Sequence, residues 1–281
     1  MERIRPGRHF FQHRKWAPFE MLAHLDPGLI IDAGAANGSM TKAALRHAKP
    51  GSRAIAFEPF PGNWPTCEKN LAGSPATLIK AALGAKPGIA KFYVRATVPE
   101  SGYSSLGYLV ETKSLLERFK MWLRRRRHPD GRMYSVPVVR VDDHATERVL
   151  FLKIDVQGGE LGVLKGARNA FDRGVDLLYV EFGGELDVLR FLLDRGYIIF
   201  DQEYLLPQCP QLDLEQWDIV REDKLTTGRQ VFRGWLKSTP EDPGEFCALF
   251  DRWKTRVGSV QTDIVAMRPD IYERLKTTYS L

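Results

Sequence analysis

One segment near the start of the chain, I-I-D-A-G-A-A-N-G-S, constrains the fold more than any other. An apolar run at residues 29–33 leads into a glycine turn, and residues 39–47 then carry apolar side chains at helical spacing. A strand that enters a glycine turn and continues as a helix is typical of nucleotide-binding loops in open α/β sheets. The segment therefore predicts an α/β protein with a ligand site at the end of its first strand.

Further apolar runs of strand length alternate with helical patterns along the chain. The later runs and the second helical pattern lie at residues 54–58, 76–81, 150–156, 177–182 and 160–171. The stretch V-L-F-L-K-I at residues 149–154 is almost continuously apolar, which is typical of a strand covered by helices on both faces. We predict a doubly wound, mostly parallel Rossmann-like sheet, with an antiparallel edge strand at residues 263–267.

This alternation breaks in two places. Residues 88–141 hold β-rich pieces at 89–94 and 134–141, around a serine loop and a helix-like segment, and we interpret them as an insertion that carries specificity. Residues 201–281 are less regular and contain several prolines. We predict a basic N-terminal extension at 1–28 and one domain over 29–281, because 281 residues of 43% apolar composition can bury a large core.

The composition says more about the cellular location of the protein than about its function. The 41 basic and 35 acidic residues give a net charge of +6, which favours anionic partners without requiring nucleic acid. The three cysteines form no C-x-x-C pair, so neither a disulfide framework nor a zinc site is indicated. We see no secretory signal and no apolar run of the ~20 residues that span a bilayer, and we expect a cytoplasmic protein.

The glycine turn itself predicts the kind of ligand. Asp32 ends the strand, and Gly34 and Gly38 are expected to let the backbone approach a ligand, with Ala36 and Asn37 between them. A dinucleotide site needs a middle glycine for the pyrophosphate, and Ala36 stands in its place. An acidic residue at the turn suits the cationic amino-acid end of S-adenosylmethionine better than a phosphate. A plain strand-to-helix turn is the alternative.

A second carboxylate follows at the end of the next predicted strand. Glu58 stands twenty residues after Gly38 in the sequence A-F-E-P, where a carboxylate can accept both ribose hydroxyls of a bound nucleoside. Pro59 stops the strand and is placed with Glu58 in the predicted cofactor site. Alone, Glu58 would more often be a solvated charge at a strand end.

Two further acidic residues follow the last two predicted parallel strands. Asp155 follows the buried strand at residues 149–154, and Glu181 ends the strand at 177–182. Because carboxyl ends of parallel strands share one sheet edge, we expect these side chains to converge as a general base or a divalent-metal site. The alternative makes Asp155 a turn former and the nearby Glu160 a charge at a helix start.

The motifs together resemble the FkbM family of methyltransferases. The resemblance covers residues 29–200 and is carried by the glycine loop, F-E-P-x-P, S-S-L at Ser104, Ser105 and Leu106, V-D-D at 141–143 and K-I-D-V-Q-G-x-E at 153–160. It implies methyl transfer from S-adenosylmethionine to a hydroxyl group of a sugar or another small natural product. Ser104 and Ser105 are expected to contact the ligand or the acceptor, with an ordinary turn as the alternative.

A hydroxyl acceptor needs a base or a metal, because aliphatic alcohols ionise far above neutral pH. His144 follows two aspartates and is the best placed histidine for a base. Lys153 inside a strand is either a buried base or an ion-pair partner of a nearby carboxylate, and pairing is favoured. Asp142, Asp155 and Glu181 are candidate ligands for magnesium, which the sequence leaves open.

Residues 115–128, L-L-E-R-F-K-M-W-L-R-R-R-R-H, join apolar side chains to a basic run. Such a segment favours contact with an anionic membrane surface or a lipid-linked substrate, or a solvated basic helix end. A nicotinamide-dependent oxidoreductase and a nucleic-acid methyltransferase remain alternative functions. The missing middle glycine argues against the first. The weak interleaving of basic and aromatic residues argues against nucleic acid.

Overall fold

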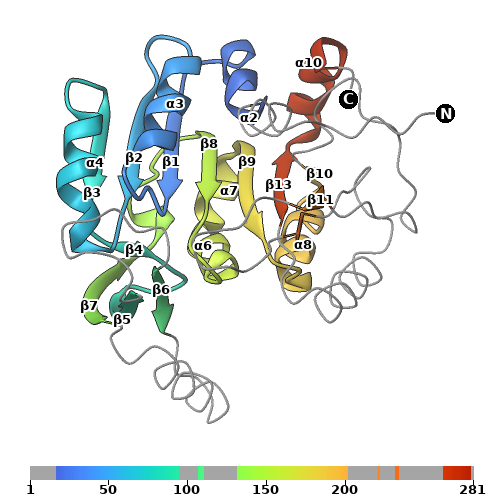
Figure 1. The fold of residues 1–281 in the computed structure, drawn as a ribbon. Coiled ribbons are helices and arrows are strands. Elements are labelled where there is room, and N and C mark those ends of the chain that lie inside the picture. The colour runs from blue at the N-terminus through green and yellow to red at the C-terminus, as the bar shows by residue number, and fades with distance from the viewer. Residues whose placement is uncertain are drawn as a thin grey trace. The chain divides into compact units, whose positions relative to one another are not determined.

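The computed structural model describes residues 17–94, 107–110, 132–201, 220–221, 232–233 and 262–279 (Figure 1). The predictions for Ser104, Ser105, residues 115–128 and most of the chain beyond residue 201 lie outside these described residues. The chain divides into two compact units: residues 27–174, and residues 1–26 together with 175–281. In the described part of the chain, no helix is long and apolar enough to cross a membrane.

Seven strands form a sheet in the order β10-β13-β9-β8-β1-β2-β3. Residues 27–174 contribute four of them, which pair in parallel: β1 (Leu29–Ala33), β2 (Arg53–Phe57), β3 (Ala76–Ile79) and β8 (Val149–Ile154). Every residue of β1 and β8 is buried, as the continuous apolar runs predict. The prediction of a mostly parallel α/β sheet is confirmed.

The described helical elements of the same unit are short. They are α3 (Ser39–His47), η2 (Pro61–Asn63), α4 (Trp64–Leu71), η3 (Val141–Asp143), α6 (Glu160–Lys165) and α7 (Arg168–Arg173). The single helix predicted over 160–171 is wrong, because the structure breaks it at Gly166. A β-carbon on Gly166 would lie 2.1 Å from the carbonyl oxygen of Gly84, so this glycine allows a close backbone approach at the break.

The predicted insertion forms a sheet of its own, with strand order β4-β7-β5-β6. Its strands are β4 (Ala82–Leu83), β5 (Gly88–Val94), β6 (Gly107–Val110) and β7 (Arg132–Val139). Alternate residues of β5 and β7 bury one face of this sheet, and Phe92, Val94 and Val136 pack there with Phe60. Phe60 follows β2, so this small sheet packs beside the carboxyl end of a strand of the main sheet.

The other unit contains β9 (Val175–Phe182), β10 (Ile198–Asp201) and β13 (Thr262–Met267), and β13 pairs antiparallel with both of the others. The prediction that residues 263–267 form the edge strand is therefore wrong, because β10 takes that place. The remaining described elements of this unit are α2 (Ala17–Glu20), η1 (Met21–His24), α8 (Leu186–Leu193), β11 (Val220–Arg221), β12 (Phe232–Arg233) and α10 (Pro269–Tyr279). Phe19, Met21 and Leu22 are fully buried, so this part of the predicted N-terminal extension belongs to the core.

Candidate functional site

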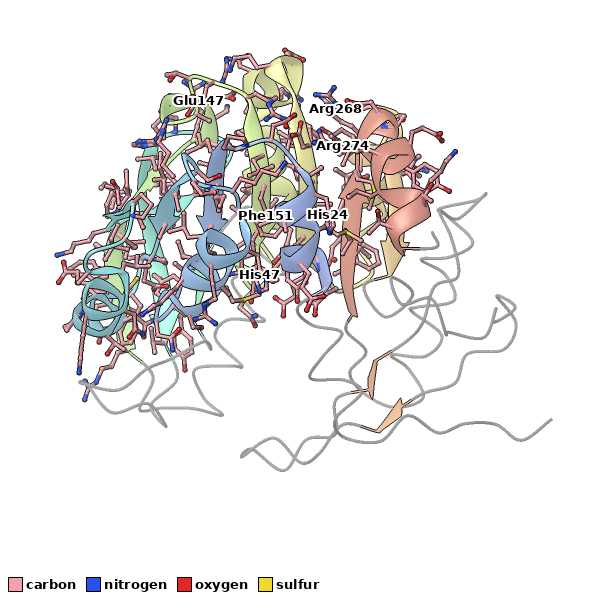
Figure 2. The ribbon with its side chains drawn as sticks, turned by 90° about the horizontal axis from the view of Figure 1, so that it is seen from above. His24, His47, Glu147, Phe151, Arg268 and Arg274 are labelled. Atoms are coloured by element: carbon pink, nitrogen blue, oxygen red, sulfur yellow. The ribbon has the colours of Figure 1, made fainter. Side chains whose placement is uncertain are left out.

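The carboxyl ends of three parallel strands meet in residues 27–174. Ala33, the last residue of β1, is in register with Phe57 of β2 and Ile154 of β8. At the opposite, amino edge, Arg53 and Glu147 form an ion pair of 2.7 Å. Glu147 is labelled in Figure 2. Ligands of open α/β sheets bind beyond the carboxyl ends, so the loops after β1, β2 and β8 form the candidate site.

The loop from β1 to α3 contains three residues with left-handed backbone: Gly34, Ala36 and Gly38, with φ of 78°, 51° and 76°. A β-carbon on Gly34 would lie 2.0 Å from the carbonyl oxygen of Asp155, and one on Gly38 would lie 3.1 Å from Cys67 Sγ. Both glycines thus make room for other parts of the protein. That they also serve the approach of a ligand stays a prediction.

Most of the loop N–H groups donate hydrogen bonds inside the protein. The N–H groups of Gly34 and Ala35 both donate to the carbonyl oxygen of Phe57 at 3.0 Å, and that of Gly38 donates to Ala35 at 2.7 Å. The N–H of Ala36 donates to Glu58 Oε2 at 2.7 Å. The loop is therefore tied to the end of β2.

Asn37 fixes the end of the loop. Its side-chain oxygen accepts the N–H of Ser39 at 3.0 Å, where α3 begins, and its carbonyl oxygen accepts the side-chain amide of Asn70 at 2.8 Å. Asn70 lies on α4, so the loop is also joined to the helix that follows β2.

Glu58 is buried at the site and carries a raised pKa. Its side chain accepts the N–H of Ala36 on one oxygen and the N–H of Phe60 on the other, both at 2.7 Å, and the residue is 4% exposed. Burial raises the pKa of Glu58 from 4.5 to about 7, although the hydrogen bonds and the charge of Lys153 act in the opposite direction. Pro59, between these two contacts, is buried as well.

Asp32 is buried in an ion pair. Its Oδ1 lies 3.0 Å from Lys153 Nζ, and its Oδ2 accepts the hydroxyl of Thr41 at 2.6 Å. The favoured prediction for Lys153, pairing with a carboxylate, is confirmed. The contact of Asp32 with a cationic ligand stays a prediction, and Lys153 balances the charge of Asp32 in the structure.

The turn after β8 holds the more exposed carboxylate of the site. The Asp155 side chain is 36% exposed, and its Oδ1 accepts the side-chain amide of Gln157 at 3.0 Å. Gln157 has a left-handed backbone, with φ of 59°. Glu160 is 4% exposed and accepts the N–H of Gly158 at 2.8 Å, so it shapes the turn at the start of α6, as its alternative interpretation predicts.

The magnesium site predicted from Asp142, Asp155 and Glu181 is not supported. Among the described residues, no three His, Cys, Asp or Glu side chains are grouped so that they could hold a metal ion. The carboxylate of Asp142 instead accepts the N–H groups of Asn169 and Ala170 at the start of α7, at 3.2 and 2.9 Å. This residue therefore has a structural role, as a helix cap.

The catalytic roles of Asp155, His144 and Glu181 stay predictions. The ring of His144 meets Phe57 edge-on, with 5.2 Å between the ring centroids. Glu181 lies on β9 in the other unit, opposite Asp263 of β13. Four predicted site residues lie together around the loop from β1 to α3: Asp32, Glu58, Lys153 and Asp155.

Sequence reasoning missed Thr41 and Asn63, which complete the buried network. Thr41 lies in the first turn of α3, nine residues after the aspartate that it contacts. The side chain of Asn63, in η2, hydrogen-bonds Glu58. A polar residue in the first helical turn after a glycine loop is the available signal for Thr41. No local pattern indicates Asn63.

A family model and several solved structures are similar to this chain. The model of the methyltransferase FkbM domain matches residues 32–199. A solved methyltransferase FkbM from Methylobacillus flagellatus KT is 20% identical, with 56% of this chain and 32% of that one covered and a TM-score of 0.36. This chain thus spans about a third of the length of that protein. The comparison with curated proteins finds no match.

Two further solved structures are similar over most of the chain. Precorrin-6y C5,15-methyltransferase from Geobacter metallireducens GS-15 is 14% identical, with 92% and 89% covered and a TM-score of 0.41. An O-methyltransferase from Bacillus cereus in complex with SAH is 9% identical, with 95% and 84% covered and a TM-score of 0.35. The family match spans more than half of the chain, from Asp32 to Ile199, and so the chain belongs to the FkbM family of methyltransferases.

Proposed function

We propose that this chain binds S-adenosylmethionine at the loop between β1 and α3 and transfers the methyl group to a hydroxyl of a small molecule. The acceptor class is a sugar or a glycosylated or lipid-linked natural product. The polarity of the loop carries the choice of cofactor. Its N–H groups donate hydrogen bonds within the protein, so the groups that surround the ligand position are mainly carboxyl groups. Membership of the FkbM family supports methyl transfer as the reaction.

The hydrogen bonding of the loop argues against a dinucleotide. A pyrophosphate is held by backbone N–H groups that point at it from the loop and the helix start. Here the N–H groups of Gly34, Ala35, Ala36 and Gly38 already donate within the protein. A phosphate at this loop would therefore have to displace existing hydrogen bonds.

The charges near the loop favour a cationic ligand. Asp32, Glu58 and Asp155 bring three carboxyl groups to the loop, and Lys153 brings one ammonium group. Lys153 balances Asp32, so the remaining negative charge is that of Asp155 and of the ionised fraction of Glu58. This charge would repel an anion and attract the sulfonium and ammonium groups of S-adenosylmethionine. Bound there, this cofactor supplies an electrophilic methyl group.

Glu58 retains capacity to accept one ribose hydroxyl. A carboxylate offers about four acceptor positions. The N–H groups of Ala36 and Phe60 use one on each oxygen, and the side chain of Asn63 contributes a further hydrogen bond. The same carboxyl group would therefore fix both the loop and the nucleoside, which couples the shape of the site to its ligand.

We assign the base for the acceptor hydroxyl to Asp155. It follows β8 beside the loop and exposes about a third of its side chain, whereas Asp32 and Glu58 are buried. The side chain of Gln157 holds one of its oxygens. Lys153 is unsuited to this role because its ammonium group donates to backbone carbonyls. His144 is the second candidate.

Calorimetric titration of the full chain tests the cofactor. S-adenosylhomocysteine should bind the wild type and NADH should not. Glu58→Gln should weaken the binding of S-adenosylhomocysteine roughly 10-fold, about 1.4 kcal/mol. The glutamine side chain has one oxygen, so one of the two backbone N–H groups that Glu58 accepts would face the NH2 group instead. Glu68→Gln is the matched control, since Glu68 pairs with Lys80 on the surface at 2.8 Å. Binding of NADH alone, or equal affinities of the two variants, would contradict the assignment.

Transfer of a deuterated methyl group tests the acceptor. The chain is incubated with methyl-labelled S-adenosylmethionine and a panel of sugars, sugar nucleotides and lipid-linked sugars, and the products are examined by mass spectrometry. Resistance of the label to mild base excludes a methyl ester, and fragmentation that places the label on oxygen identifies an ether. Asp155→Asn should abolish turnover and keep S-adenosylhomocysteine binding, while Asp172→Asn, on the surface of α7, should keep both. A label on nitrogen or carboxyl, or normal turnover by Asp155→Asn, would contradict the proposal.

A further inference from the structure

Lys153 contacts three consecutive residues at the junction of β1 and the loop. Its Nζ lies 3.0 Å from Asp32 Oδ1, 3.3 Å from the carbonyl oxygen of Ala33 and 2.6 Å from that of Gly34. An ammonium group has three N–H donors, and three oxygens lie within reach. The contact follows from the parallel register, in which Lys153 of β8 stands opposite Asp32 of β1.

Packing alone does not explain a lysine at this position. The other residues of β8 are apolar and the strand is buried throughout, so a methionine would fill a similar volume without charge. Replacement of a buried ion pair by apolar residues is often neutral or stabilising, by about 1–4 kcal/mol. A buried lysine that is 2% exposed is therefore expected to serve something other than the stability of the core.

Gly34 is held from three sides, and Lys153 provides one of them. Its N–H donates to Phe57 of β2, and its α-carbon faces the carbonyl oxygen of Asp155 beyond β8. Its own carbonyl oxygen accepts from Lys153 at 2.6 Å, a short and charge-assisted hydrogen bond. Without the lysine, this partly buried carbonyl would lose that donor, and the loop would lose its tie to β8.

We propose that Lys153 is a positioning residue, whose ammonium group holds the start of the glycine loop in its ligand-binding shape before any ligand arrives. Its approach to Asp155 Oδ2, at 3.9 Å, extends the same control to the exposed carboxylate of the site. The identity of the ligand rests on the proposed function, whereas the role of Lys153 in ordering the loop does not. A preformed loop improves affinity because less ordering remains to be done on binding.

Two variants separate positioning from stability. Lys153→Met alone leaves the carboxylate of Asp32 buried with the hydroxyl of Thr41, and breaking a buried pair in this way is strongly destabilising. The double variant Asp32→Asn/Lys153→Met removes both charges and is expected to fold. Lys165→Met is the matched control, because Lys165 is an exposed lysine at the end of α6.

Amide hydrogen exchange of the ligand-free full chain is the primary measurement. In the double variant, the amides of Gly34, Ala35 and Ala36 should exchange roughly 10-fold faster, equivalent to about 1.4 kcal/mol of lost protection. The amides of β5 should exchange at the wild-type rate. The affinity for S-adenosylhomocysteine should fall roughly 10-fold by the same measure. Lys165→Met should change neither quantity.

Unchanged exchange in the loop of the double variant would overturn the proposal. Acceleration of loop and β5 amides together, or failure of the double variant to fold, would also overturn it, since either would show a general stabilising role. The exchange measurement needs no ligand. If the wild type does not bind S-adenosylhomocysteine, the proposed function fails, and loop exchange still decides the role of Lys153.

Discussion

Replacement of Glu58 by glutamine is expected to change how the stability of the fold depends on pH. Burial raises the pKa of Glu58 from 4.5 to about 7, so the folded chain binds this proton more tightly than the unfolded chain does. The stabilising contribution of the protonated form is therefore fully present below pH 4.5. It is lost as the pH rises through 7.

The magnitude follows from this change in pKa. One pKa unit corresponds to about 1.4 kcal/mol, so a rise from 4.5 to about 7 lowers the free energy of unfolding by about 3 kcal/mol across this range. Solvent screening reduces this free-energy change little, because Glu58 is only 4% exposed. Glutamine is neutral throughout, and any cost of its amide is the same at every pH.

Urea denaturation of the wild type and Glu58→Gln between pH 4.5 and 8 measures the effect. The difference in unfolding free energy between the two proteins should move by about 3 kcal/mol in favour of the variant as the pH rises. Glu68→Gln, at the exposed pair with Lys80, should show no comparable trend, since such pairs contribute about 0–1 kcal/mol. Parallel pH profiles for the wild type and Glu58→Gln would refute the reasoning.

Three further substitutions or modifications test the packing of the site. Gly34→Ala should lower the free energy of unfolding, measured by thermal denaturation, by at least about 3 kcal/mol, because the new β-carbon would overlap the carbonyl oxygen of Asp155 at 2.0 Å. Gly73→Ala is the control: with φ of 73° and open space around it, it should lower the same free energy by about 1–2 kcal/mol. Thr41→Val should lower the free energy of unfolding by about 1–3 kcal/mol, since a buried carboxylate oxygen loses its hydroxyl donor, whereas Thr66→Val on the surface of α4 should change it little. Burial raises the pKa of Cys67 to about 12, so iodoacetamide at pH 8 should alkylate this thiol only after unfolding, as peptide mass spectrometry would show.

The elements that the sequence predicts best are those with strong local signals. The bounds of β1 and α3 are as predicted, because an apolar run, a glycine turn and a helical pattern follow one another without a gap. The positions of Asp32 and Glu58 at strand ends follow from the same local order. Because neighbouring parallel strands end at one sheet edge, local signals alone are enough to place these two residues near one another.

Their partners depend on the order of strands in the sheet, which no local pattern contains. The ion pair of Asp32 with Lys153 joins residues more than a hundred positions apart, and it forms because β8 lies beside β1. The place of β13 between β9 and β10 has the same origin. The capping role of Asp142 likewise depends on where α7 lies in space.

The most direct test of the central claim is amide hydrogen exchange of the wild-type chain with and without saturating S-adenosylhomocysteine. We predict that the ligand slows exchange in the loop from Gly34 to Gly38 and around Phe60, and that NADH does not. Protection that falls elsewhere in the chain, or that NADH alone produces at this loop, would contradict the assignment of the site and of its cofactor.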